Sequence, residues 1–82
     1  MTERELTIQE YEVEGYSFEQ TSFELETGGY NVTIRNVETE EILVDKTMYS
    51  ITGLIDFFEN ERPVIIVEWV TNKLEEDNHA SN

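Results

Sequence analysis

The chain has 82 residues, and its 19 acidic residues outnumber its 5 basic residues, which gives a formal net charge of −14. Such a charge disfavours direct contact with nucleic acid or with an anionic membrane, because like charges repel, and it favours a basic protein as the partner. The absence of cysteine excludes disulfides and a thiolate nucleophile.

The length and the hydropathy pattern predict one small domain. Apolar residues are 38% of the chain but are grouped in runs, which predicts a folded core over residues 1–74. Most of residues 75–82 are acidic or amide-bearing, which predicts a disordered tail. No segment has the pattern of a signal peptide or a membrane span, so we expect a cytoplasmic protein.

Alternating apolar and polar residues predict four strands in the first 48 residues. The predicted strands cover residues 6–13, 22–26, 30–37 and 41–48. In the first of them the alternation changes parity at Gln9-Glu10, which allows a bulge or an early end. Gly15 is a plausible break, after which Tyr16 and Phe18 continue the apolar face. Gly28-Gly29 predicts a hairpin turn, because glycine accepts positive φ at both central positions.

A helix follows the strands. Ser50 is a good N-cap, and Ile51, Leu54, Ile55 and Phe58 then recur at the spacing of one helix face. The pair Arg62-Pro63 predicts the end of this helix, since the residue before proline disfavours the α conformation.

The run of apolar, β-branched residues over 64–70 predicts a central strand that is covered on both faces. The expected order is therefore β-β-β-β-α-β. The fold class is α+β, with a mainly antiparallel sheet of four to five strands and one helix packed on one face.

The sequence lacks the residues of common catalytic sites. His79 is the only imidazole, so a Ser-His-Asp triad and a two-histidine metal site are excluded within one chain. The glycines lack the spacing of a phosphate loop, and a glycosidase-like carboxylate pair needs a deeper cleft than a chain of this length builds. We expect no enzymatic activity, no metal and no cofactor.

The acidic residues are arranged in ladders. Glu10, Glu12 and Glu14 alternate along one predicted strand, as Glu24 and Glu26 do along another. Alternate strand residues are about 6.8 Å apart, so each ladder is a sparse imitation of a row of phosphates. Further acids could extend it from the helix and from a turn: Asp56, Glu59, Glu38, Glu40 and Glu41. Solvated strand faces or adaptation to high salt are the alternative interpretations.

Affinity for a partner usually needs an apolar anchor as well as charge. Leu54, Phe57 and Phe58 are the candidates, and core packing is the alternative for each of them. Phe57 lies off the apolar stripe of the helix and is therefore the candidate most open to exposure. Tyr49 and Trp69 are further aromatic possibilities.

Residues 30–74 resemble the small acidic uracil-DNA glycosylase inhibitors of φ29-like phages. The resemblance runs through the strand Tyr30-Asn31-Val32-Thr33, the Ser-capped helix that contains Phe57-Phe58, and the apolar run opened by Val64-Ile65-Ile66. It implies a β-β-α-β homodimer that blocks the glycosylase by mimicking DNA. It also implies that Leu54 and Phe58 occupy the positions of two helix aromatics, the first of which enters the glycosylase pocket. The same shape and acidity also resemble small phage anti-CRISPR proteins, which occupy the DNA-recognition groove of a nuclease by similar mimicry.

Three functions are compatible with these features. The first is an acidic nucleic-acid mimic, of phage origin, that blocks the nucleic-acid site of a basic protein such as uracil-DNA glycosylase or a CRISPR nuclease. The alternatives are a non-catalytic protein-protein interaction module that uses a sheet edge or Phe57, and a structural homodimer. The predicted partner-binding residues are Glu10, Glu12, Glu14, Glu24, Glu26, Leu54, Asp56, Phe57, Phe58 and Glu59.

Overall fold

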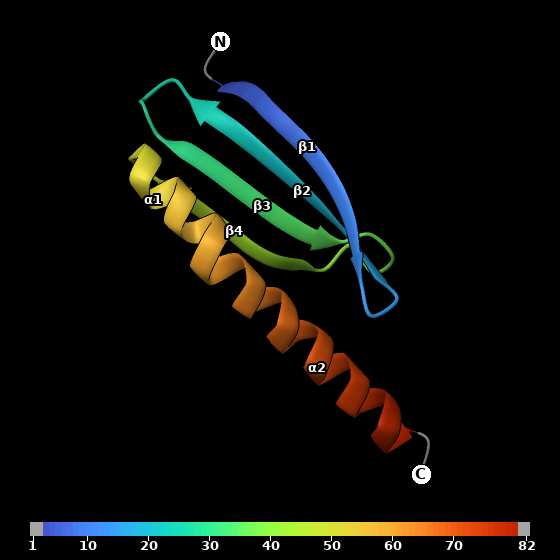
Figure 1. Ribbon diagram of the computed structural model, residues 1–82. Helices are drawn as coiled ribbons and strands as arrows, with labels where there is room; N and C mark the ends of the chain where they lie inside the picture. The colour runs from blue at the N-terminus through green and yellow to red at the C-terminus, as the bar shows by residue number, and fades with distance from the viewer. Residues whose placement is uncertain (1–2, 81–82) are drawn as a thin grey trace.

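The computed structural model describes the backbone of residues 3–80 and the side chains of residues 8–76. The elements are β1 (Glu3–Val13), β2 (Tyr16–Leu25), β3 (Tyr30–Asn36), β4 (Ile42–Met48), α1 (Ile51–Asp56), the π-helical segment η1 (Phe57–Glu61) and α2 (Arg62–Ala80) (Figure 1). Four antiparallel strands and a C-terminal helical segment confirm the predicted α+β class.

The strands form a meander in which each strand pairs with the next, in the order β1-β2-β3-β4. Alternation places Phe18, Val32 and Ile34 on the inner face, under the helical segment, where they are fully buried. The outer face of the sheet carries the residues of opposite parity, including the directly opposed pair Glu10 and Glu19. Within residues 3–80, a helix covers the inner face of the sheet and none covers the outer face (Figure 1).

Two tight turns set the length of the first three strands. Glu14 and Gly15 both have positive φ, 53° and 85°, so β1 and β2 join through a two-residue hairpin, and β2 begins earlier than the alternation predicted. The hairpin predicted at Gly28-Gly29 joins β2 to β3, but of these two glycines only Gly28 has a positive φ, of 100°. A Cβ at Gly29 would lie 2.9 Å from Cδ1 of Tyr49 and 3.1 Å from the carbonyl oxygen of Met48, so a side chain there would displace Tyr49.

The irregularity expected in β1 lies elsewhere. The register of β1 against β2 shifts between Glu5 and Thr7, whereas Gln9 and Glu10 are paired regularly with Gln20 and Glu19. The change of parity in the sequence has a different cause: Ile8 points to the outer face, where it is 55% exposed.

The predicted helix start is confirmed. Ser50 has an extended backbone, and its Oγ accepts a hydrogen bond of 3.0 Å from the backbone N–H of Gly53. The side chain thereby satisfies one of the N–H groups that the first helical turn leaves unpaired.

The predicted strand over residues 64–70 is wrong, because α2 spans this segment. The predicted helix end at Arg62-Pro63 is wrong for the same reason. Proline lacks an N–H and its ring collides with the carbonyl four residues earlier, but the preceding turn is a π-helix. There the N–H of Arg62 donates to the carbonyl of Phe57, five residues back. This wider turn accommodates Pro63 without ending the helix.

The helix also continues where the sequence predicted a disordered tail. Helix α2 extends to Ala80, so residues 75–80 are helical, while residues 81–82 lie outside the described residues. The side chain of His79 lies outside them too. Among residues 3–80, no helix combines the length and the apolar character that crossing a membrane requires.

Candidate functional site

The predicted carboxylate ladders do not form one continuous track. Glu10 and Glu12 lie on the outer face of β1, paired with Glu19 and Ser17, and both are exposed. Glu24 of β2 lies on the other face of the sheet, the inner face that also carries Phe18, and it is half-buried there. Glu26 is exposed in the β2–β3 turn, at the other end of the sheet.

The helical acids also lie away from Glu10 and Glu12. Asp56 and Glu59 are exposed on α1 and η1, which follow the end of β4 that pairs with the start of β3 (Figure 1). Asp56 Oδ1 accepts a hydrogen bond of 2.6 Å from Asn60 Nδ2. Asp56 and Glu59 therefore do not extend the row of carboxylates formed by Glu10 and Glu12.

Two turns instead gather carboxylates at one end of the sheet. Because the sheet is an antiparallel meander, the β1–β2 and β3–β4 turns lie at the same end (Figure 1). We call this surface the acidic end, defined by six exposed residues: Glu10, Glu12, Glu14, Glu38, Glu40 and Glu41. Glu38, Glu40 and Glu41, which were predicted only to extend the ladders, thus make up half of the acidic end.

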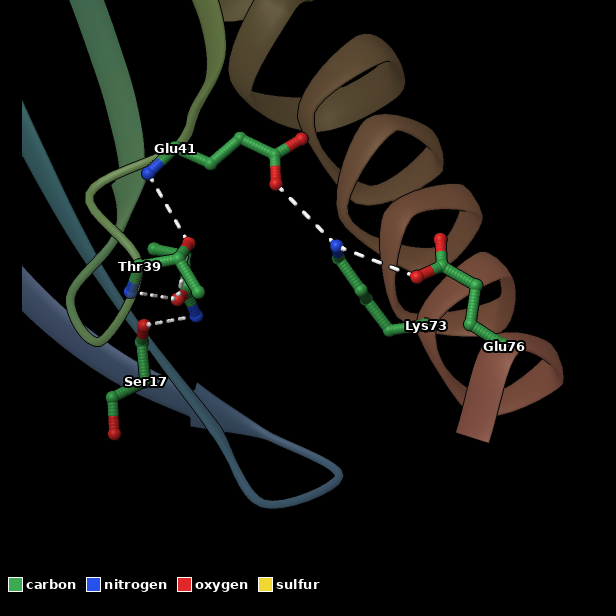
Figure 2. Close-up of polar contacts among 6 residues, drawn as sticks. Ser17, Thr39, Glu41, Lys73 and Glu76 are labelled. Carbon is green, nitrogen blue, oxygen red and sulfur yellow. Dashed lines mark hydrogen bonds and ion pairs between the residues drawn. The ribbon is translucent and has the colours of Figure 1, made fainter. Parts of the chain in front are cut away.

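A buried asparagine, which sequence reasoning missed, fixes the β3–β4 turn against β2. Asn36 is 1% exposed, and its Nδ2 donates to the carbonyl of Ser17 at 3.1 Å. Its Oδ1 accepts hydrogen bonds from N and Oγ1 of Thr39 at 2.9 and 3.0 Å, and Figure 2 shows Thr39 and Ser17 on either side of this link. The available signal was an Asn at a strand end followed three residues later by Thr, a pattern typical of side-chain-closed turns.

An open hollow of about 440 Å³ lies within the acidic end. It is lined by Glu10 and Glu12 of β1, Ser17 of β2 and Val37 at the start of the β3–β4 turn, among others. The backbone N–H of Val37 donates to the carbonyl of Ser17 at 2.9 Å, which holds the two sides of the hollow together. The hollow can receive a cationic side chain beside the carboxylates of Glu10 and Glu12, which both lie on β1.

Basic residues neutralise little of this surface. Arg35 Nη2 lies 2.8 Å from Glu19 Oε1, and Lys46 Nζ lies 2.7 Å from Glu61 Oε1. Lys73 Nζ of α2 lies 3.6 Å from Glu41 Oε1 and 3.8 Å from Glu76 Oε1. Figure 2 shows Lys73 between these two glutamates. Within residues 8–76, no ion pair involves Glu10, Glu12, Glu14, Glu38 or Glu40.

The predicted apolar anchors are largely packed into the fold. Phe57 is fully buried, so the expectation that it is open to exposure is wrong. Phe58 and Leu54 are half-buried against the core, and the Phe58 ring lies under the Arg62 guanidinium at 4.9 Å. In the same way, Trp69 packs edge-on against Phe18. Tyr49 is 75% exposed. The segment opened by Val64-Ile65-Ile66, a strand in the resemblance to the glycosylase inhibitors, is helical here.

Comparison of the chain with known protein families, with curated proteins and with solved structures gave no match. Among the described residues, no group of three or more His, Cys, Asp or Glu side chains is arranged to hold a metal ion.

Proposed function

We propose that this protein binds the nucleic-acid site of a basic protein through its acidic end, and so inhibits that protein as a nucleic-acid mimic. The observation that carries the proposal is the hollow lined by Glu10 and Glu12 beside the β3–β4 turn, with no basic side chain paired to them among residues 8–76. The carboxylates of β1 and of the β1–β2 and β3–β4 turns offer a basic surface negative charge, as a phosphate backbone does.

The mode of binding proposed here differs from a plug mechanism. Phe57 is buried and Phe58 is half-buried, so neither is free to enter a partner's pocket without rearrangement of the core. Electrostatic attraction therefore drives the association of the two proteins, and the affinity should fall strongly as the salt concentration rises. Uracil-DNA glycosylase and CRISPR nucleases are the candidate targets, and a phage is the source in which such an inhibitor is useful.

The test is a pull-down from bacterial lysate at low salt, followed by elution with short duplex DNA or single-stranded RNA and mass spectrometry. We expect a nucleic-acid-binding protein that the nucleic acid displaces. Purified uracil-DNA glycosylase and a purified CRISPR nuclease are then assayed for inhibition. A captured protein that nucleic acid does not displace would contradict the mimicry.

Two variants of equal charge locate the binding surface. The variant Glu12→Gln/Glu14→Gln/Glu40→Gln changes the acidic end, whereas Glu26→Gln/Asp56→Asn/Glu59→Gln removes three charges at the other end of the molecule. We expect the first variant to lose at least tenfold in affinity and the second to stay within about threefold of the wild type. Equal losses would assign the binding to net charge rather than to the acidic end.

A further inference from the structure

Helix α2 carries apolar side chains on a side that the sheet leaves uncovered. Ile66 and Val70 are buried in the core, whereas Val64, Val67 and Leu74 are 54%, 58% and 42% exposed. With Thr71, the exposed residues recur at intervals of three and four, which places them on one stripe of the helix. An apolar stripe with this spacing is typical of a helix that packs against a second helix.

The sheet beside this stripe is wider than one helix can cover. Four strands about 4.8 Å apart span about 14 Å between the outer strand axes, and one helix is about 10 Å wide. Helix α2 lies along the β4 side, and β1 lies at the opposite edge of the sheet (Figure 1). The inner side of β1 is therefore left partly open.

An open apolar groove of about 320 Å³ runs between β1 and α2. Its lining includes Tyr11 and Val13 of β1 and Pro63, Ile66 and Val67 of α2. Arg62 also reaches the groove, but its Nη1 donates to Gln20 Oε1 at 2.9 Å and its guanidinium stacks on Phe58. The groove thus offers aliphatic and aromatic surface rather than a free cation.

The charged residues beside the stripe indicate which kind of helix can bind there. Glu68 and Glu75 are exposed and lie seven residues apart, along the edge of the stripe next to Val64. A second copy of this chain would set these acids, and a net charge of −14, against an equal charge. A helix with basic residues along its facing edge would instead form ion pairs there, as flanking charges do in coiled coils.

We propose that the groove and the exposed stripe of α2 bind an amphipathic helix of a partner protein. The partner helix presents aliphatic side chains to Val64, Val67 and the groove, and Lys or Arg to Glu68 and Glu75. The stripe from Val64 to Leu74 spans about 15 Å, so about three turns of helix are engaged. This inference is independent of the proposed function, because it uses no residue of the acidic end.

The test uses three synthetic peptides of equal length with full-length protein at 150 mM salt, followed by fluorescence anisotropy. The first has leucines at heptad a and d positions with lysines beside them, the second has glutamates in place of those lysines, and the third is a scramble of the first. We expect the first to bind at least tenfold more tightly than either of the others. Equal binding of the first and the scramble would overturn the proposal, since charge alone would explain it.

Variants then tie binding to the surface. Val64→Ser/Val67→Ser should weaken binding of the lysine peptide at least tenfold, whereas Ile51→Ser/Ile55→Ser, which removes exposed apolar residues of α1, should not. Glu68→Lys/Glu75→Lys should reverse the preference toward the glutamate peptide. The acidic-end variant should bind the lysine peptide like the wild type, so failure of the proposed function leaves this result intact.

Circular dichroism checks that each variant is folded, and sedimentation equilibrium tests the competing occupant. A wild-type dimer that Val64→Ser/Val67→Ser converts to a monomer would assign the groove to a second copy and overturn the proposal. An unchanged peptide affinity in that variant would overturn it as well.

Discussion

Glu14 and Glu40 both occupy turn positions at which φ is positive, 53° and 63°. A residue other than Gly, Asn or Asp is destabilised by about 1–2 kcal/mol in this conformation. Glu14 precedes Gly15 in a two-residue hairpin, for which Asn-Gly is the preferred sequence. Both strained glutamates belong to the acidic end, so charge is kept there at a cost in stability.

Replacing Glu14 with a residue that tolerates positive φ should stabilise the protein. We expect Glu14→Asn to raise the free energy of unfolding by about 1 kcal/mol, measured by urea denaturation. Glu14→Gln is the control, because it removes the same charge without relieving the backbone. If both variants have the same stability, the conformation at residue 14 is not the source of the gain.

The raised pKa of Tyr11 should make the stability of the protein depend on pH in alkaline solution. Burial raises the pKa of Tyr11, and the nearby Arg62 guanidinium partly lowers it. Because the folded pKa lies above the unfolded value, this stabilisation is complete below about pH 10 and is lost as the pH rises through the folded pKa. The free energy of unfolding should therefore fall above pH 10, and less so in Tyr11→Phe. Tyr49→Phe, at a site that is 75% exposed, should follow the wild type.

At the scale of elements, η1 determines which side chains form the core. Its wide turn lets the adjacent Phe57 and Phe58 both pack toward the core, with ring centroids 5.8 Å apart. It also directs Ile66 and Val70 of α2 onto the sheet. Alternation in the sequence predicted all four strands, because that signal is local, although it placed the start of β2 six residues too late. The course of the chain through Pro63 was not predictable in the same way, since it depends on a rare turn that tertiary packing stabilises.

Deleting a single exposed residue of η1 should therefore cost more than replacing it. Removal of Asn60 rotates α2 by about 100° relative to α1, which turns Ile66 and Val70 out of the core. We expect this deletion to destabilise the protein by at least about 3 kcal/mol, and Asn60→Ala by less than about 1 kcal/mol, in thermal or urea unfolding. Similar stabilities for the two variants would mean that α2 adapts without η1.

At the scale of the whole molecule, the candidate site was only partly predictable. Strand parity correctly grouped Glu10 with Glu12, because side-chain direction within a strand has a fixed period of two. Parity alone could not predict that Glu24 lies on the other face of the sheet, or that the β3–β4 turn lies at the same end of the sheet as Glu12 and Glu14. Those relations depend on the register between strands and on the order of the strands, which are set by non-local pairing.

If negative charge is concentrated at the acidic end, its repulsion should be measurable in the unfolding of the free protein. The net charge of −14 opposes folding at low ionic strength, and salt screens exposed charges over about 10 Å at 0.1 M. We expect Glu12→Gln/Glu14→Gln/Glu40→Gln to raise the free energy of unfolding at 10 mM salt by about 1 kcal/mol more than Glu26→Gln/Asp56→Asn/Glu59→Gln does. Because both variants lose three charges, that difference reports where the charges lie and not how many there are. It should disappear in 0.5 M salt, and a difference that persists there would have to come from packing or backbone conformation instead.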